Sequence, residues 1–114
     1  MKRLYLATIN SWNGLRAAAR SDAAVREELI VILLAIPTAY LIAVTTARAI
    51  ELVLVLMLLL AVELLNTAIE KLCDHLAPEK SAQIKVVKDL GSAAVFFSIV
   101  IAAAVWLIVL AHGL

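Results

Sequence analysis

The sequence predicts an all-α integral membrane protein, with three transmembrane helices preceded by an amphipathic helix at the membrane surface. The chain has 114 residues, the length of one domain, and 65% of them are hydrophobic, against about 45–50% in soluble domains. Only three residues are glycine and two are proline, whereas Ala and Leu are strong helix formers. We therefore expect residues 1–114 to form a single membrane domain.

The first predicted element is a surface helix over about residues 4–20. Its larger apolar residues recur at spacings of three and four, so they share one helical face. Polar and basic residues follow the same spacing on another face. Helices with Trp and Arg arranged in this way are typical of the membrane surface; a soluble helix packed on a neighbour is the alternative. The apolar face holds Tyr5, Ile9, Trp12, Leu15 and Ala19, and the polar face holds Asn13, Arg16 and Arg20.

Three charge-free stretches follow, at 29–44, 52–62 and 90–111. A spanning helix needs about 20 mostly apolar residues. The third stretch meets this length by itself, and the other two need their flanks. Pro37 is tolerated inside a membrane helix, although it can kink it. The predicted spans are about 27–46, 49–72 and 88–112.

The distribution of Lys and Arg predicts the orientation. Positive residues near the ends of spans favour the cytoplasmic side, and here only Arg48 lies on the opposite side. The N-terminus and the connection between the second and third spans should therefore be cytoplasmic, and the C-terminus should lie on the outer side of the membrane. The predicted cytoplasmic set is Lys2, Arg3, Arg16, Arg20, Arg26, Lys71, Lys80, Lys85 and Lys88.

A row of polar residues on the second span is the feature most indicative of function. Glu63, Asn66, Glu70 and Asp74 are separated by three, four and four residues, so they share one helix face. A charge at the centre of a bilayer costs roughly 2.5–3.5 kcal/mol, and such residues are normally functional. At 1.5 Å per residue, Glu63 lies about 21 Å from the outer start of this span. The row should thus run from the inner leaflet to the cytoplasmic surface.

The chemistry of this row suits phosphate transfer at the membrane interface. Acidic oxygens bind Mg²⁺, which usually takes one or two carboxylates and substrate phosphates. A carboxylate partly inside the apolar layer is a good proton acceptor, and Glu63 is the deepest. Helix-to-helix hydrogen bonding by Glu63 or Asn66 is the structural alternative, and Glu70 and Asp74 could simply be solvated.

Several classes of protein are excluded or disfavoured. The formal net charge of +1 gives no indication of nucleic acid as a partner. No G-x-x-x-x-G-K-[ST] motif occurs, so the chain is not a P-loop enzyme. Cys73 is the one cysteine, which excludes an intrachain disulfide and a metal site built from several cysteines.

Three motifs resemble those of the prokaryotic diacylglycerol kinase family. Residues 63–70, E-L-L-N-T-A-I-E, followed by Asp74, are similar to the family signature E-x-x-N-[ST]-A-I-E-x-x-x-D. Residues 88–95, K-D-L-G-S-A-A-V, match a second family segment. Residues 11–18, with Ala23 to Glu28, resemble a third. In order along the chain, the motifs cover about residues 3–112.

The resemblance implies a homotrimer that phosphorylates diacylglycerol with MgATP to give phosphatidic acid, with sites shared between subunits among membrane lipids. It also implies a multi-pass protein of a bacterial inner membrane, which would make the C-terminus periplasmic. Glu63 would be the general base on the lipid hydroxyl, and Glu70 would hold Mg²⁺. The nucleotide site implied by the resemblance comprises Arg3, Arg16, Asn66, Glu70, Lys88 and Asp89, and the lipid-substrate site comprises Trp12, Arg16, Glu63 and Ser92.

The resemblance also assigns two acids near the first span. Asp22 stands where the close family pattern has a Glu that contacts metal, and its side chain is one methylene shorter. Glu28 matches a Glu that supports the residues of the site without contacting the metal or the substrate itself. Undecaprenol kinases share the E-x-x-N-[ST]-A-I-E signature and are the nearest alternative function. A small proton-coupled transporter that uses Glu63 as its carrier is an alternative of another class.

Overall fold

A computed structural model describes residues 1–76 and 81–114, and these residues form four α-helices. The helices are α1 (Lys2–Ser21), α2 (Ala23–Ile42), α3 (Thr46–Leu76) and α4 (Ala82–His112). The predicted all-α class is therefore confirmed. Lys80, which the sequence assigned to the cytoplasmic side, lies outside the described residues.

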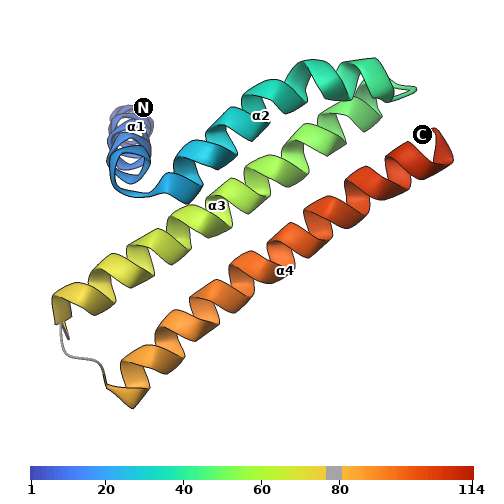
Figure 1. The fold of residues 1–114 in the computed structure, drawn as a ribbon. Helices are drawn as coiled ribbons and strands as arrows, with labels where there is room; N and C mark the ends of the chain where they lie inside the picture. Colours follow the sequence, from blue (N-terminus) through green and yellow to red (C-terminus); the bar gives the residue numbers. More distant parts are fainter. Residues whose placement is uncertain (77–80) are drawn as a thin grey trace.

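Helix α1 lies across the other three helices. Figure 1 shows α1 nearly end-on while α2, α3 and α4 run side by side across the view. Its buried residue is Ala18, so α1 touches the bundle near its C-terminal end. Tyr5 and Trp12, on the predicted apolar face, remain 66% and 61% exposed. The rest of the described chain leaves these side chains uncovered, as expected for a helix whose apolar face contacts lipid.

Helix α2 begins directly after Asp22, whose side chain accepts a hydrogen bond from the backbone N–H of Ala24 at 2.9 Å. This is the usual N-cap arrangement, in which a side-chain oxygen satisfies one of the free donors of the first turn. The helix continues through Pro37 and ends at Ile42. Helix α2 therefore begins four residues before the first residue of the span expected at 27–46, and it ends four residues before the last residue of that span.

Helices α3 and α4 have 31 residues each, longer than a bilayer crossing requires. They pack along their length, with α2 on the other side of α3 (Figure 1). A core cluster at one end joins all three through Ala39, Ala49, Leu52 and Val109. Beside it, the indole N–H of Trp106 donates to the backbone carbonyl of Leu52 at 3.1 Å.

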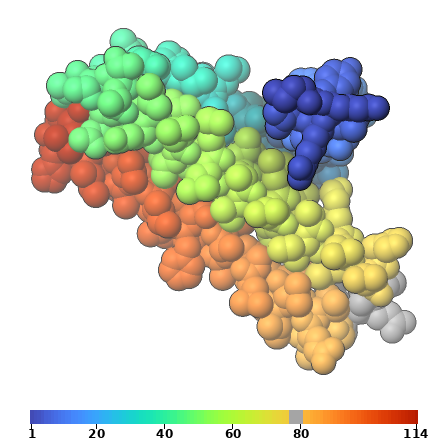
Figure 2. Space-filling view, turned by 180° about the vertical axis from the view of Figure 1, so that it is seen from behind, coloured from blue at the N-terminus to red at the C-terminus, as the bar shows by residue number. Residues whose placement is uncertain are grey.

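Two helices of the described chain, α3 and α4, are long and apolar enough to cross a membrane. Helix α2 has a comparable apolar length but carries Arg26, Glu27 and Glu28 near its start. Large apolar side chains such as Phe96 and Phe97 are mostly exposed on α4. Figure 2 shows α3 and α4 as long neighbouring surfaces, with α1 projecting beside them. These features indicate a helical membrane protein.

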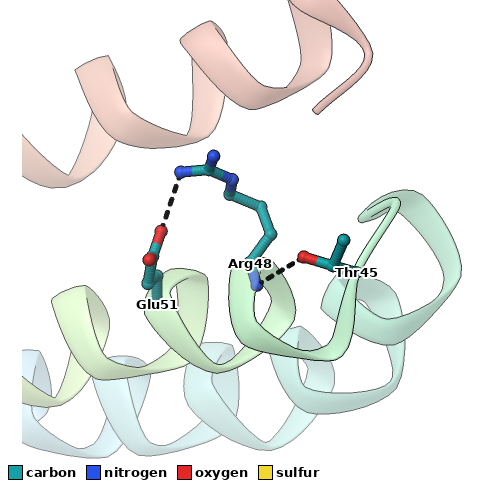
Figure 3. Close-up of polar contacts among 3 residues, drawn as sticks. All are labelled: Thr45, Arg48 and Glu51. Carbon is teal, nitrogen blue, oxygen red and sulfur yellow. Dashed lines mark hydrogen bonds and ion pairs between the residues drawn. The ribbon is translucent and has the colours of Figure 1, made fainter.

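The end of the bundle that joins α2 to α3 has few polar groups. Arg48 forms an ion pair with Glu51 at 2.9 Å, and its backbone N–H is capped by the Thr45 hydroxyl (Figure 3). The backbone N–H of Val44 donates to the carbonyl of Leu114 at 3.0 Å, which brings the chain end to the same place. The sole basic residue that the sequence places on this side is thus paired with an acid.

Candidate functional site

The buried polar side chains of the described residues are Glu63, Asn66 and Thr67, which lie together on α3. Their exposed fractions are 6%, 8% and 6%. Glu70, one turn further along the same face, is half-buried, and Asp74 is exposed. The row that the sequence predicted as one stripe therefore runs from the interior of the bundle to its surface.

Two acids from the start of α2 face this row. The carboxyl groups of Glu28 and Asp22 both lie close enough to that of Glu63 to interact with it electrostatically. The Oε2 atom of Glu28 is buried and has no hydrogen-bond partner among the described residues. Because a buried, unpartnered oxygen is costly, this position suits a donor or a cation from outside the single chain.

Asp22 is held by α3 as well as by its own helix. The Thr67 hydroxyl donates to its Oδ2 atom at 2.6 Å. This hydrogen bond, together with the backbone N–H of Ala24, lowers the pKa of Asp22 below its ordinary value, against a smaller opposing effect of burial. Both carboxylate oxygens of Asp22 are consequently engaged within the chain.

Asn66 connects α3 to α4. Its side-chain amide donates to Glu70 Oε1 at 3.5 Å. Its Oδ1 atom is buried without a partner among the described residues and lies against Gly91 of α4, so closely that a Cβ at position 91 would overlap it. Only a glycine leaves room for this amide at the helix contact.

The polar residues predicted at the start of α4 are divided between two ion pairs. Lys88 contacts Asp74 of α3 at 2.5 Å, and Lys85 contacts Asp89 at 2.7 Å. Ser92 is exposed. Lys88 therefore stands beside the acidic row, one turn beyond Glu70, while Asp89 is occupied by its neighbour on the same helix.

Three predicted site residues of α1 remain apart from the cluster. Arg3, Trp12 and Arg16 are exposed and have no hydrogen bond or ion pair with the acidic row in the part of the chain that the structure describes. With a rise of 1.5 Å per residue, Arg3 lies about 20 Å along α1 from Arg16. A single chain does not bring these three side chains together with Glu63.

Sequence reasoning did not single out Thr67 or Gly91. Thr67 stands inside the E-L-L-N-T-A-I-E run, and Gly91 inside K-D-L-G-S-A-A-V, so both were visible as motif positions. Their roles depend on contacts between helices, with Asp22 of the α1–α2 junction and with Asn66 of α3. Spacing along one helix carries no information about such contacts.

Glu70 suits a magnesium ion whose remaining ligands come from a nucleotide and water. Within residues 1–76 and 81–114, no group of three His, Cys, Asp or Glu side chains is arranged to hold a metal ion. Mg²⁺ commonly takes only one or two carboxylates and completes its shell with phosphates and water. Half-buried Glu70, which accepts from the side-chain amide of Asn66, can supply one such carboxylate.

These features define a class: a small helical membrane protein with a polar, acid-rich site toward one end of its bundle. The family model for prokaryotic diacylglycerol kinase matches residues 9–110. A diacylglycerol kinase of Escherichia coli (strain K12) is 39% identical over 108 residues, which are 95% of this chain and 88% of the relative. The chain belongs to the prokaryotic diacylglycerol kinase family.

Other relatives show a similar likeness. A diacylglycerol kinase of Pseudomonas aeruginosa is 36% identical over 96% of this chain and 89% of its own length. A diacylglycerol kinase of Haemophilus influenzae is 31% identical over 93% of this chain and 90% of its own length. The likeness therefore extends over nearly the whole of each chain, and it confirms the resemblance inferred from the three motifs.

Proposed function

We propose that this protein is an ATP-dependent kinase that phosphorylates diacylglycerol to phosphatidic acid at the cytoplasmic face of a bacterial inner membrane. Membership of the family supports the reaction. The observation that carries the assignment to a site is the burial of Glu63 at 6% exposure, in a row that continues to the bundle surface. A lipid alcohol and a water-soluble nucleotide can meet along such a row.

Glu63 is the proposed general base. Its carboxylate accepts the proton of the lipid hydroxyl as the hydroxyl oxygen forms a bond to the γ-phosphorus of ATP. The bond from that phosphorus to the β–γ bridging oxygen breaks, and ADP leaves. Phosphoryl transfer depends mainly on positioning and charge neutralisation, so one base with well-placed cations is a sufficient set of groups.

The nucleotide occupies the outer part of the row in this proposal. Glu70 would hold Mg²⁺, which would supply neutralisation of the phosphate charge, and Asn66 orients Glu70 through the amide contact of 3.5 Å. Lys88 approaches the phosphates from α4, where its pairing with Asp74 positions it. Asp89 and Ser92, which lie one turn apart on α4, complete the edge of the site.

A second and third copy of the chain complete the site. Arg3, Trp12 and Arg16 lie on the exposed surface of α1, where they can reach substrate only if neighbouring subunits or the lipid headgroups bring it to them. The buried, unpartnered Oε2 of Glu28 and Oδ1 of Asn66 also indicate missing partners. A homotrimer with shared sites, as the resemblance implies, would bring substrate to the α1 residues and would supply partners for these two buried oxygen atoms.

A direct assay tests the function. The purified protein in mixed micelles is given γ-labelled ATP and Mg²⁺ with diacylglycerol or undecaprenol, each offered separately. We expect labelled phosphatidic acid from diacylglycerol and little transfer to undecaprenol. If undecaprenol alone gains phosphate, the substrate assignment is wrong, and if neither lipid does, the kinase assignment is wrong.

A further inference from the structure

Asp22 is the single residue that separates two helices and touches a third. As the C-cap of α1, it has an extended backbone with φ −130° and ψ 114°, and its N–H donates to the carbonyl of Ala18 at 2.8 Å. As the N-cap of α2, it accepts from Ala24. The Thr67 hydroxyl then ties the same side chain to α3 at 2.6 Å. The direction of α1 therefore depends on Asp22.

Arg26 reinforces this junction from the first turns of α2. Its guanidinium Nη1 donates to the backbone carbonyls of Ala19 at 2.8 Å and of Arg20 at 3.3 Å. Cationic groups at a helix C-terminus satisfy its free carbonyls and interact favourably with its dipole. The turn between α1 and α2 is thus held by side chains on both sides of Asp22.

We propose that Asp22 in this chain is a positioning residue, which acts through Thr67 to fix α1 across α3, and that it is not a ligand of the catalytic metal. Each of its carboxylate oxygens already accepts a hydrogen bond within the chain, and its side chain is one methylene shorter than the glutamate of the family pattern. Because Glu63 lies next to Asp22, the tether also sets how α1 stands relative to the proposed base. This inference rests on the proposed kinase function.

Thr67 also lines a cavity between α1 and α3. The cavity has a volume of roughly 390 Å³, and Ser11, Gly14, Ala18, Leu64, Thr67 and Lys71 are among its lining residues. Release of Asp22 from Thr67 would let α1 swing away and change the shape of this space. The expected kinetic result is weaker substrate binding, with the requirement for Mg²⁺ unchanged.

The variant Asp22→Asn separates the two roles because it removes the charge and keeps the tether. The carbamoyl oxygen of Asn can still accept from Ala24, since Asn and Asp are comparable N-caps. Its NH₂ group can donate to the Thr67 hydroxyl, which is both donor and acceptor. Thr67→Val does the opposite: it removes the tether and leaves the carboxylate in place. Thr67→Ser keeps both.

The test compares these variants with the wild type, whose diacylglycerol phosphorylation must be measurable first; its absence would overturn the proposed function. We expect Asp22→Asn and Thr67→Ser to keep the half-saturating Mg²⁺ concentration and most of kcat/KM. We expect Thr67→Val to raise the KM for substrate about tenfold, with a smaller change in kcat. Thr38→Val is the matched control, because the Thr38 hydroxyl bonds only within its own helix, to Leu34.

Two readouts other than activity complete the test. Tryptic cleavage at Arg16 and Arg20 of α1 should become about fivefold faster in Thr67→Val and Asp22→Ala, because local opening exposes a helix to protease. Binding of Mn²⁺ as a probe, followed by its EPR signal, should be equal in wild type and Asp22→Asn. The proposal is overturned if Asp22→Asn weakens Mn²⁺ binding and Mg²⁺ activation, or if Thr67→Val behaves like Thr38→Val.

Discussion

Gly91 of α4 lies directly against the side-chain amide of Asn66 on α3, with its absent Cβ leaving the space that the Asn66 Oδ1 atom occupies. The ideal Cβ position at Gly91 is also only 3.3 Å from Asn66 Cγ. The same amide donates to Glu70. A side chain at position 91 would therefore have to displace the Asn66 amide from its present position.

Gly91→Ala should separate the two helices or turn the Asn66 amide away from Glu70. Overpacking of this kind costs about 1–3 kcal/mol, and we expect kcat to fall by about tenfold or more because Glu70 loses its orientation. Lipid phosphorylation and thermal unfolding of the purified protein measure the two effects. The control is Ala104→Ser, at an exposed position of the same helix. Equal activity in the two variants would contradict the role of Gly91.

Glu63→Gln should abolish turnover, because the amide keeps the shape of the side chain but cannot accept a proton from the lipid hydroxyl. Loss of a general base typically lowers the rate by about 10²–10⁴-fold. Chemical crosslinking or light scattering should show the same assembly as the wild type. The comparison variant is Glu51→Gln, whose carboxylate is exposed and pairs with Arg48 at the other end of the bundle. Activity in Glu63→Gln near that of the wild type would remove this residue from the mechanism.

Trp106→Phe should lower stability without changing catalysis. The substitution removes the hydrogen bond from the indole N–H to the Leu52 carbonyl, which is worth about 0.5–1.5 kcal/mol, while most of the aromatic packing remains. Denaturation in detergent should report a modest loss, and kcat and KM should stay unchanged because the core cluster is remote from Glu63. Phe97→Leu, on an exposed part of α4, serves as the control. A large change in kcat would show that the two ends of the bundle are coupled.

The attachment of α1 should be resistant to mild acid. The Thr67 hydroxyl lowers the pKa of Asp22 below its ordinary value, which is about 3.9 for aspartate. A carboxyl group with a lower pKa in the folded state contributes stability above its unfolded pKa, and this stability is lost as the pH falls through the folded value. In Thr67→Val the tether is already absent at neutral pH, so acid should loosen α1 in the wild type and change this variant little. Fluorescence of Trp12 in a Trp106→Phe background follows α1 during the titration, and the same acid-induced change in both proteins would contradict the tether.

The helical class and the acidic stripe could be predicted because both depend on spacing along one chain. Glu63, Asn66 and Glu70 recur at three and four residues, and backbone hydrogen bonds fix the same spacing in any α-helix. Apolar length also predicted α3 and α4 as membrane-spanning. The end of α2 at Ile42 was not predicted, because the apolar sequence continues to Val44 and composition does not distinguish a helix from the turn that follows it.

The sequence by itself determined four helices, their apolar surfaces and the single face that carries the acids, since these follow from local periodicity and the exclusion of charge from lipid. Only the tertiary structure decided that Asp22 meets Thr67, that Gly91 meets Asn66 and that Lys88 pairs with Asp74. Contacts between helices depend on how their side chains interlock and on the geometry of the turns that join them. No spacing within one helix contains that information.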